Sequence, residues 1–371
     1  MTFLYFLLVI GPLVFLHEMG HYLAARWCGV KADVFSIGFY GEIIGWTDKR
    51  GTRWKVGWIP LGGYVRFAGD EDASSGPNET WKNLPEEERV HSYLAQPVWK
   101  RATISFAGPF ANFLVAIFIY MALFANFGET RVTPIVAQVA PNSAASEAGF
   151  QVGDRIRAVN GRAVTNFSDI GEYVAMRPKQ MMTFDVERAG KPLSITTAPK
   201  EDKLISRFGT TETRGLLGVG ASEKQREQVQ LSLAELPGAA IKQVFRVLRS
   251  ITDGLIQIIM GYHSVKELGG VIMIAKVANE VASMGWIALI EFIAMISINL
   301  GFINLLPVPM LDGGHLLFQG IEALRRKPVA LAAQEWAYRF GFVFVMGLML
   351  FVTVNDLVRF GYLGRLGDLI G

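Results

Sequence analysis

The stretch Leu13-Val14-Phe15-Leu16-His17-Glu18-Met19-Gly20-His21-Tyr22-Leu23 places three ionisable side chains inside an apolar segment. The surrounding run from Met1 to Ala25 is otherwise free of charged residues and histidine. Its length is sufficient for a membrane-spanning helix, which needs roughly 20 residues. It lacks a basic leading region and an A-x-A-like cleavage site, so we interpret it as a retained span rather than a signal peptide. Ionisable groups inside such a helix are costly unless they are paired or bind a ligand.

Three more uncharged runs follow, at 102–128, 292–311 and 340–355. With the first run they predict four transmembrane helices, over 1–25, 102–128, 286–311 and 335–358. The composition agrees, because 51% of residues are hydrophobic and only 19% are charged, below the roughly 25% charged residues typical of soluble proteins. The net charge of +3 comes without a Lys/Arg block, which argues against a nucleic-acid partner. The single cysteine, Cys28, excludes an internal disulfide and a multi-cysteine zinc knuckle.

The segments between the spans differ in character. Alternating polar and apolar residues predict membrane-associated β-hairpins within 26–101, with a turn at Asp48-Lys49-Arg50-Gly51. Residues 129–222 read as a compact αβ module, and an apolar stripe in 223–285 predicts an amphipathic helix and a connecting segment. A loop at 312–334 and a tail at 359–371 complete the division.

Basic residues near the predicted helix ends set the expected orientation. One side carries Arg26, Lys31, Lys100, Arg101, Arg325, Arg326, Lys327 and Arg339, and the other carries Arg131, Lys276, Arg359 and Arg365. The bias places 26–101 and 312–334 in the cytoplasm, and 129–285 with both termini outside.

The motif His17-Glu18-Met19-Gly20-His21 has the H-E-x-x-H pattern. On a helix, residues i and i+4 share one face, so both imidazoles can bind one metal ion while Glu18 takes a proton from water at that ion. A catalytic zinc needs a third protein ligand. Glu42 has a suitable spacing but falls in a hairpin region, whereas Asp312 ends an apolar run at a proline-rich break, where a carboxylate indicates a functional site. We favour Asp312.

These motifs carry a family resemblance. H-E-M-G-H in the first span, Asn304-Leu305-Leu306-Pro307-Val308-Pro309-Met310-Leu311-Asp312-Gly313-Gly314 at the third, and Ala107-Gly108-Pro109-Phe110-Ala111-Asn112 in the second resemble the site-2 protease family of intramembrane zinc metalloproteases. The bacterial regulator of sigma-E protease subgroup is most similar. The resemblance implies His17, His21 and Asp312 as zinc ligands and Glu18 as the catalytic base. It further implies that Asn299 and Asn304 act near the substrate.

The segment Ala144–Gly161 resembles the signature of bacterial PDZ domains, and Gly215-Leu216-Leu217-Gly218-Val219-Gly220 resembles their carboxylate-binding loop. Such domains bind a peptide as an added strand. Leu216, Leu217 and Gly218 are therefore the candidate contacts for a peptide C-terminus. A PDZ fold that acts as a spacer or steric filter is the alternative.

The resulting hypothesis is a polytopic α-helical membrane protein with four transmembrane helices, a β-hairpin region and one inserted extracytoplasmic PDZ domain. The resemblance implies a Zn²⁺-dependent endopeptidase of the bacterial inner membrane, with the PDZ domain in the periplasm. Its substrates would be transmembrane segments of single-pass proteins, such as trimmed anti-sigma factors or remnant signal peptides. A non-catalytic receptor with a structural metal does not need Glu18. A metal transporter would carry more ligating residues along its spans than one cluster and Glu291.

Overall fold

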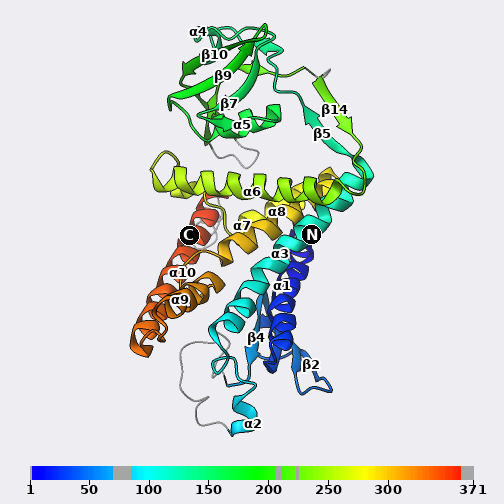
Figure 1. Ribbon diagram of the computed structural model, residues 1–371, viewed down its shortest axis with the longest axis vertical. Helices are drawn as coiled ribbons and strands as arrows, with labels where there is room; N and C mark the ends of the chain where they lie inside the picture. The colour runs from blue at the N-terminus through cyan, green and yellow to red at the C-terminus, as the bar shows by residue number, and fades with distance from the viewer. Residues whose placement is uncertain (1, 70–84, 206–210, 223–224, 361–371) are drawn as a thin grey trace, which may run out of the picture. The chain divides into compact units, whose positions relative to one another are not determined.

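The computed structural model describes residues 2–69, 85–205, 211–222 and 225–360. The chain separates into two compact units (Figure 1). One comprises Met1–Ile119 and Gly269–Asp356, and the other Tyr120–Leu268 and Leu357–Gly371.

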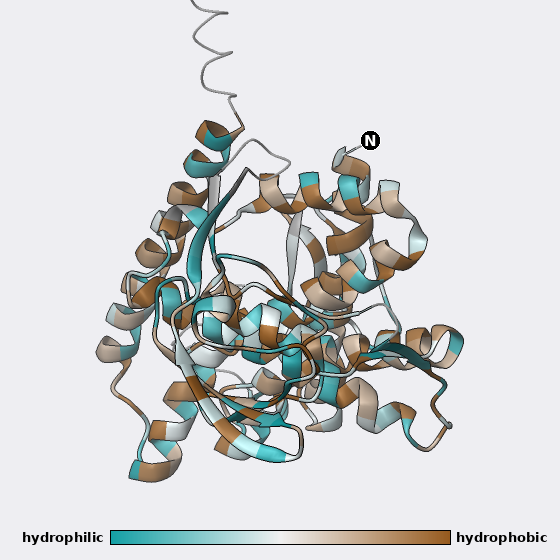
Figure 2. Ribbon diagram, turned by 90° about the horizontal axis from the view of Figure 1, so that it is seen from above, coloured by the Kyte–Doolittle hydropathy of each residue, from teal (hydrophilic) through white to brown (hydrophobic). Residues whose placement is uncertain are grey.

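Four helices in the described residues are long and apolar enough to cross a membrane. They are α1 (Thr2–Trp27), α3 (Val98–Phe127), α8 (Trp286–Asn304) and α10 (Leu331–Arg359). Hydrophobic residues colour much of the helical ribbon in Figure 2. The four predicted spans are thus confirmed as helices of sufficient length. The third helix is shorter than expected, because it ends at Asn304 instead of continuing to residue 311.

The first unit carries a four-stranded sheet that confirms β-structure after the first span. Its strands are β1 (Ala32–Phe39), β2 (Ile44–Thr47), β3 (Arg53–Val56) and β4 (Ile59–Phe67), in the order β2-β3-β1-β4. The expected turn at 48–51 joins β2 to β3. The sheet packs on α1 through aromatic contacts, with the Tyr22 ring 5.2 Å from the Trp54 ring and Trp54 stacked 4.4 Å from Phe35. β4 stands at one edge of this sheet.

Two more helices of this unit were not expected from the sequence. Helix α7 (Val271–Met284) lies in the predicted connecting segment and packs against α1. Helix α9 (Asp312–Arg325) occupies most of the segment expected to be a loop at 312–334. Arg101 of α3 and Glu322 of α9 form an ion pair of 2.6 Å, and buried Gln319 of α9 donates to Ser105 Oγ of α3 at 3.2 Å. These contacts attach α9 to α3. Short helix α2 (Glu86–Arg89) lies in the preceding polar segment, whose residues 71–84 fall outside the described residues.

The second unit contains the αβ module. Its main sheet has the order β10-β9-β7-β8, formed by β7 (Arg155–Val159), β8 (Arg162–Ala163), β9 (Met182–Arg188) and β10 (Lys191–Thr197). Three two-stranded pairs accompany it: β11 (Lys200–Ile205) with β12 (Thr211–Leu216), β13 (Val219–Gly220) with β6 (Gln138–Val139), and β14 (Arg226–Val229) with β5 (Glu129–Val132). Helices α4 (Ala144–Glu147) and α5 (Phe167–Ala175) complete a core centred on Ile156 and Phe184.

The predicted amphipathic helix is present as α6 (Leu236–Ile259). Its polar side faces the module, because Asp253 pairs with Arg162 at 2.6 Å and with Arg177 at 3.3 Å. Its apolar side leaves Phe245 and Ile259 exposed. Two ion pairs therefore attach α6 to the module within the second unit. Short 3₁₀ helix η3 (Val265–Glu267) follows it.

Candidate metal centre

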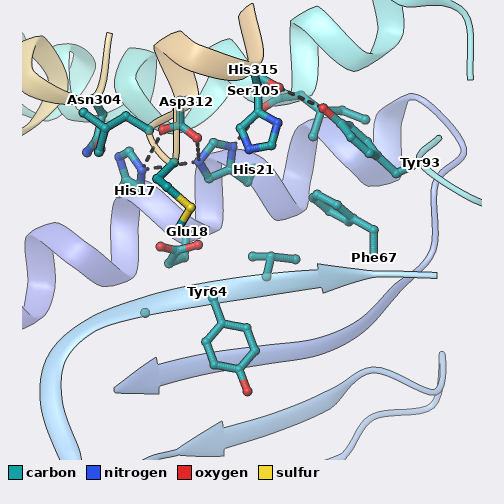
Figure 3. Close-up of a pocket in the computed structure, with 15 residues that line it drawn as sticks. His17, Glu18, His21, Tyr64, Phe67, Tyr93, Ser105, Asn304, Asp312 and His315 are labelled. Carbon is teal, nitrogen blue, oxygen red and sulfur yellow. Dashed lines mark hydrogen bonds and ion pairs between the residues drawn. The ribbon is translucent and has the colours of Figure 1, made fainter. Parts of the chain in front are cut away.

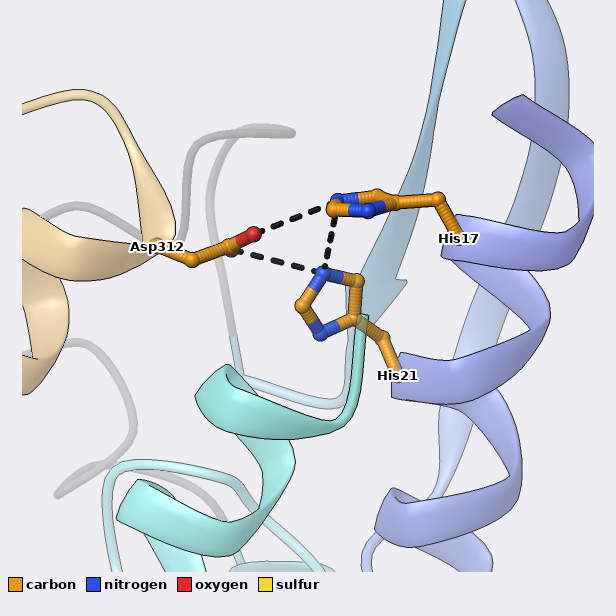
Figure 4. A group of neighbouring side chains, drawn as sticks. All are labelled: His17, His21 and Asp312. Carbon is orange, nitrogen blue, oxygen red and sulfur yellow. Dashed lines mark hydrogen bonds and ion pairs between the residues drawn. The ribbon is translucent and has the colours of Figure 1, made fainter. Parts of the chain in front are cut away.

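Three side chains from two separate elements meet inside the first unit (Figure 4). His17 and His21 project from the same face of α1, and Asp312 begins α9. The Nε2 atoms of the two histidines lie 3.3 Å apart. Asp312 Oδ2 is 3.2 Å from His17 Nε2, and Oδ1 is 3.3 Å from His21 Nε2. Both histidines are buried, and the three offer ligand atoms within 4.8 Å of one another.

This triangle fits a zinc ion. Zinc binds imidazole nitrogen and carboxylate oxygen at about 2.0–2.2 Å in tetrahedral geometry. The edge of a tetrahedron is 1.63 times the centre-to-vertex distance, so such ligands are expected about 3.3–3.6 Å apart. The distance between the two Nε2 atoms, 3.3 Å, and that between His17 Nε2 and Asp312 Oδ2, 3.2 Å, are close to that range. Two imidazoles and one carboxylate leave the fourth vertex open, which is the arrangement of a catalytic site.

The helix α3 fixes the ring of His21. Its Nδ1 lies 2.8 Å from the backbone carbonyl oxygen of Ile104. Since a carbonyl only accepts, Nδ1 carries the proton and Nε2 keeps a lone pair for a metal. Gly108 makes room for this ring, because a Cβ at that position would lie 2.2 Å from His21 Nε2. The glycine of the Gly108-Pro109 pair is therefore required by the position of the imidazole.

Asp312 owes its position to a broken helix. After α8 ends at Asn304, residues 305–311 form turns around Pro307 and Pro309, and α9 starts with Asp312 in its first turn. A carboxylate is favourable at a helix N-terminus because of the exposed amide dipoles. Its side chain is 18% exposed. The predicted break thus directs a carboxylate from a distant part of the chain to the histidine pair.

A cavity of about 230 Å³ opens beside the three side chains (Figure 3). Glu18 lines it together with β4, and Glu18 is 9% exposed. The strand approaches closely, because a Cβ on Gly63 would lie 3.0 Å from Glu18 Cγ and 2.7 Å from the carbonyl oxygen of Ser36. Tyr64 on the same strand points away from the three ligands in Figure 3. The site therefore has a carboxylate, an accessible volume and a strand edge in one place.

The other predicted residues lie in different surroundings. Asn304 lines the cavity, whereas Asn299 is half-buried on α8 and is not among the lining residues. The alternative ligand Glu42 pairs with Arg53 instead. Glu291 is exposed on α8.

Several lining residues were missed or left undecided by the sequence. His315 lines the cavity and lies 2.8 Å from the Tyr338 hydroxyl through Nδ1. Tyr93 and Ser105 also line it, and their hydroxyls lie 2.9 Å apart. Neither of these two pairs forms a local pattern in the sequence, so the position of His315, three residues after Asp312, was the one signal that the sequence offered.

The candidate peptide contacts form a second hollow within the module. Leu216, Leu217 and Gly218 line a cavity of about 150 Å³ between α5 and β12. Leu216 is exposed, Leu217 is buried, and Gly218 has a left-handed φ of 87°. The Leu217 carbonyl accepts from Ala145 N at 2.8 Å, so the loop is anchored to α4.

Comparisons with known proteins agree with this chemistry. Residues 5–348 match the model of peptidase family M50. A protein of Brucella suis named "Putative zinc metalloprotease BR1156/BS1330_I1152" is 43% identical over 96% of this chain and 95% of its own length. An Agrobacterium fabrum protein, "Putative zinc metalloprotease Atu1380", is 41% identical over 95% of this chain and 94% of its own. Metalloprotease MmpA of Caulobacter vibrioides is 36% identical over 98% and 97%.

Proposed function

This chain belongs to peptidase family M50 and is a zinc metalloprotease, and we propose that it cleaves transmembrane segments of single-pass membrane proteins. The observation that carries the proposal is the place of the metal centre. Two of its three candidate ligands lie on α1, a helix apolar and long enough to span a membrane. A soluble substrate would not meet such a site, whereas a transmembrane segment would.

The proposed ligands are His17, His21 and Asp312, with Glu18 as the catalytic base. When bound, zinc supplies a Lewis acid that polarises the scissile carbonyl and lowers the pKa of water. Glu18, in the same cavity, accepts the proton of the attacking water and delivers it to the leaving nitrogen. Glu18 is only 9% exposed, which limits the bulk water that could compete for that proton.

A helical substrate must become extended before its carbonyl can be attacked. We propose that β4 accepts it, because an edge strand has unpaired backbone groups that can bind an added strand. Gly63 and Val65 of β4 line the same cavity as Glu18. A substrate strand on this edge would pass the proposed base. We propose that Asn304, which also lines the cavity, binds a peptide group of the extended substrate. Asn299 does not line the cavity, so its proposed role requires a substrate that extends beyond it.

Glu18→Gln tests the mechanism. The amide keeps the size of the side chain but cannot accept a proton, so cleavage should fall about 10²–10⁴-fold while zinc content stays at one per chain. Cleavage of a single-pass substrate in proteoliposomes gives the first quantity, and metal analysis gives the second. Membrane proteomics of cells with this variant should reveal substrates that accumulate as spanning stubs. Near-normal cleavage would contradict the assignment of Glu18.

We further propose that the module is a PDZ domain on the periplasmic side of the bacterial inner membrane, acting in regulated intramembrane proteolysis. The cavity between α5 and β12, with Gly218 at its end, has the form expected for a peptide C-terminus. We propose trimmed anti-sigma factors and remnant signal peptides as substrates of this protease.

Deletion of residues 133–221 distinguishes two roles of the module. If it filters by size, the deletion should allow premature cleavage of a substrate with a bulky ectodomain. If it is a receptor, cleavage of the trimmed substrate should slow, and a free C-terminal peptide should compete in the full-length enzyme. A deleted enzyme that keeps zinc yet cleaves neither form would place the module in the catalytic machinery.

A further inference from the structure

Asn112 of α3 contacts Nδ1 of His17, the ring nitrogen that does not face Asp312. Its Nδ2 lies 3.0 Å from His17 Nδ1. The residue is completely buried, and its Oδ1 has no hydrogen-bond partner. A buried amide oxygen without a partner is unfavourable by about 1–3 kcal/mol. This contact therefore calls for an explanation.

The protonation of His17 decides whether the ring can bind a metal. A neutral imidazole has a proton on one nitrogen and a lone pair on the other. If Asn112 Nδ2 donates to Nδ1, the proton must lie on Nε2, which is the atom that faces His21 and Asp312. That tautomer cannot bind zinc through Nε2. A half-turn of the amide about χ2 places Oδ1 on Nδ1 instead and moves the proton to Nδ1.

We propose that Asn112 is a positioning residue that accepts a hydrogen bond from His17 Nδ1 and so holds the Nε2 lone pair toward zinc. The half-turn breaks no bond of Oδ1, because this oxygen has no partner in the other orientation. Helix α3 then orients both rings in the same way, through the Ile104 carbonyl for His21 and through Asn112 for His17. The inference rests on the proposed zinc ligands.

The chain offers matched variants for a test. Asn112→Leu removes the acceptor at similar volume, whereas Asn112→Asp keeps an acceptor that cannot donate when ionised. Ser297→Ala is the control, because Ser297 is buried and donates at 2.8 Å to the backbone oxygen of Asn112 without contacting the ring. Zinc affinity is measured on the purified full-length chain by competition with a chelator. Visible spectra of the Co²⁺-substituted protein report the ligand set.

We expect Asn112→Leu to weaken zinc binding about 10–100-fold, the usual effect of losing a partner of a metal-bound histidine. Asn112→Asp should bind zinc at least as tightly as the unmodified chain, with the same Co²⁺ spectrum. Ser297→Ala should leave the affinity unchanged. Thermal unfolding of the metal-free variants provides a control for packing. A general packing defect would lower their Tm in the absence of zinc, whereas a defect confined to the metal site would lower only the zinc affinity.

Two results would overturn the inference: unchanged affinity in Asn112→Leu, or an Asn112→Asp protein that binds as weakly as Asn112→Leu. If Asn112→Leu does not fold, Asn112→Asp decides alone. If Asn112 in fact donates to His17 Nδ1, an ionised aspartate cannot replace it, and Asn112→Asp should bind zinc weakly. Asp312→Ala tests the ligands separately. Normal zinc binding in Asp312→Ala would refute the ligand set. If Asp312→Ala loses zinc while Asn112→Leu keeps the zinc affinity of the unmodified chain, only the role of Asn112 is refuted.

Discussion

Replacement of Gly108 by alanine tests whether the imidazole of His21 occupies the place that the structure gives it. The new Cβ would lie 2.2 Å from His21 Nε2, 2.6 Å from Cε1 and 2.7 Å from Cδ2. Favourable contacts between heavy atoms lie at about 3.5–4.0 Å. The methyl group therefore overlaps the ring by more than 1 Å at the very nitrogen that faces the metal, and the ring must move.

The size of the effect follows from the clash with the ring. Excess volume in a packed core costs about 1–3 kcal/mol. The metal-free protein can relieve this clash by moving the His21 ring, whereas zinc binding needs the ring in its place. The helix propensity of alanine is the same in both states and cancels. Zinc affinity should therefore fall about 5- to 150-fold.

The assay is zinc affinity by chelator competition, together with cleavage of a transmembrane substrate. Gly11→Ala is the matched control, since it lies on apolar α1 and an added Cβ meets no atom within 4 Å. It should keep both zinc and activity. A Gly108→Ala protein with unchanged zinc affinity and cleavage would refute the placement of His21 against α3.

Three further expectations concern other parts of the chain. Metal analysis should show that Asp312→Ala loses most of its zinc, whereas Glu42→Ala keeps it, because Glu42 pairs with Arg53. The reverse result would make Glu42 the third ligand in place of Asp312. Gly63→Ala should reduce cleavage more than zinc content, since its Cβ would push β4 away from Glu18; equal losses would contradict this. Burial raises the pKa of Asp154, but hydrogen bonds from Arg188 and Gln151 lower it more, so the net shift is downward. The module should therefore lose stability as pH falls below about 4, and Asp154→Asn should flatten that dependence in hydrogen exchange of β7.

The sequence predicted the parts of this fold that local patterns encode. The four apolar runs became helices, because their length and lack of charge leave no other arrangement in a membrane. The i, i+4 spacing of His17 and His21 was sufficient to place both rings on one face of α1. Asp312 was selected through the proline-rich break before it and through the resemblance of the motif around it to the site-2 protease family. The C-terminal end of the third span was predicted at residue 311, because apolar residues continue past Asn304, where α8 ends.

Contacts between distant segments lay outside the reach of such patterns. Helix α7 is apolar but short, and nothing in its spacing shows that it packs on α1. The approach of Gly108 to His21 and of Gly63 to Glu18 depends on tertiary packing of three elements. The hydrogen-bond partner of His17 is 95 residues away. Each of these requires knowledge of which helix faces which.

The break between α8 and α9 explains how a carboxylate can reach a site among apolar helices. Irregular backbone at membrane depth is tolerated only where its polar groups are satisfied or face a cavity. Pro307 and Pro309 have no N–H to satisfy. Other amides of the segment bond locally, with carbonyl acceptors at 2.7–3.2 Å for Leu305, Leu306, Val308 and Leu311. The cavity lies at the end of this segment, lined by Met310, Leu311 and Asp312. A continuous helix would have hidden the carboxylate and closed the space that water needs, so the same break provides both a ligand and access for the second reactant.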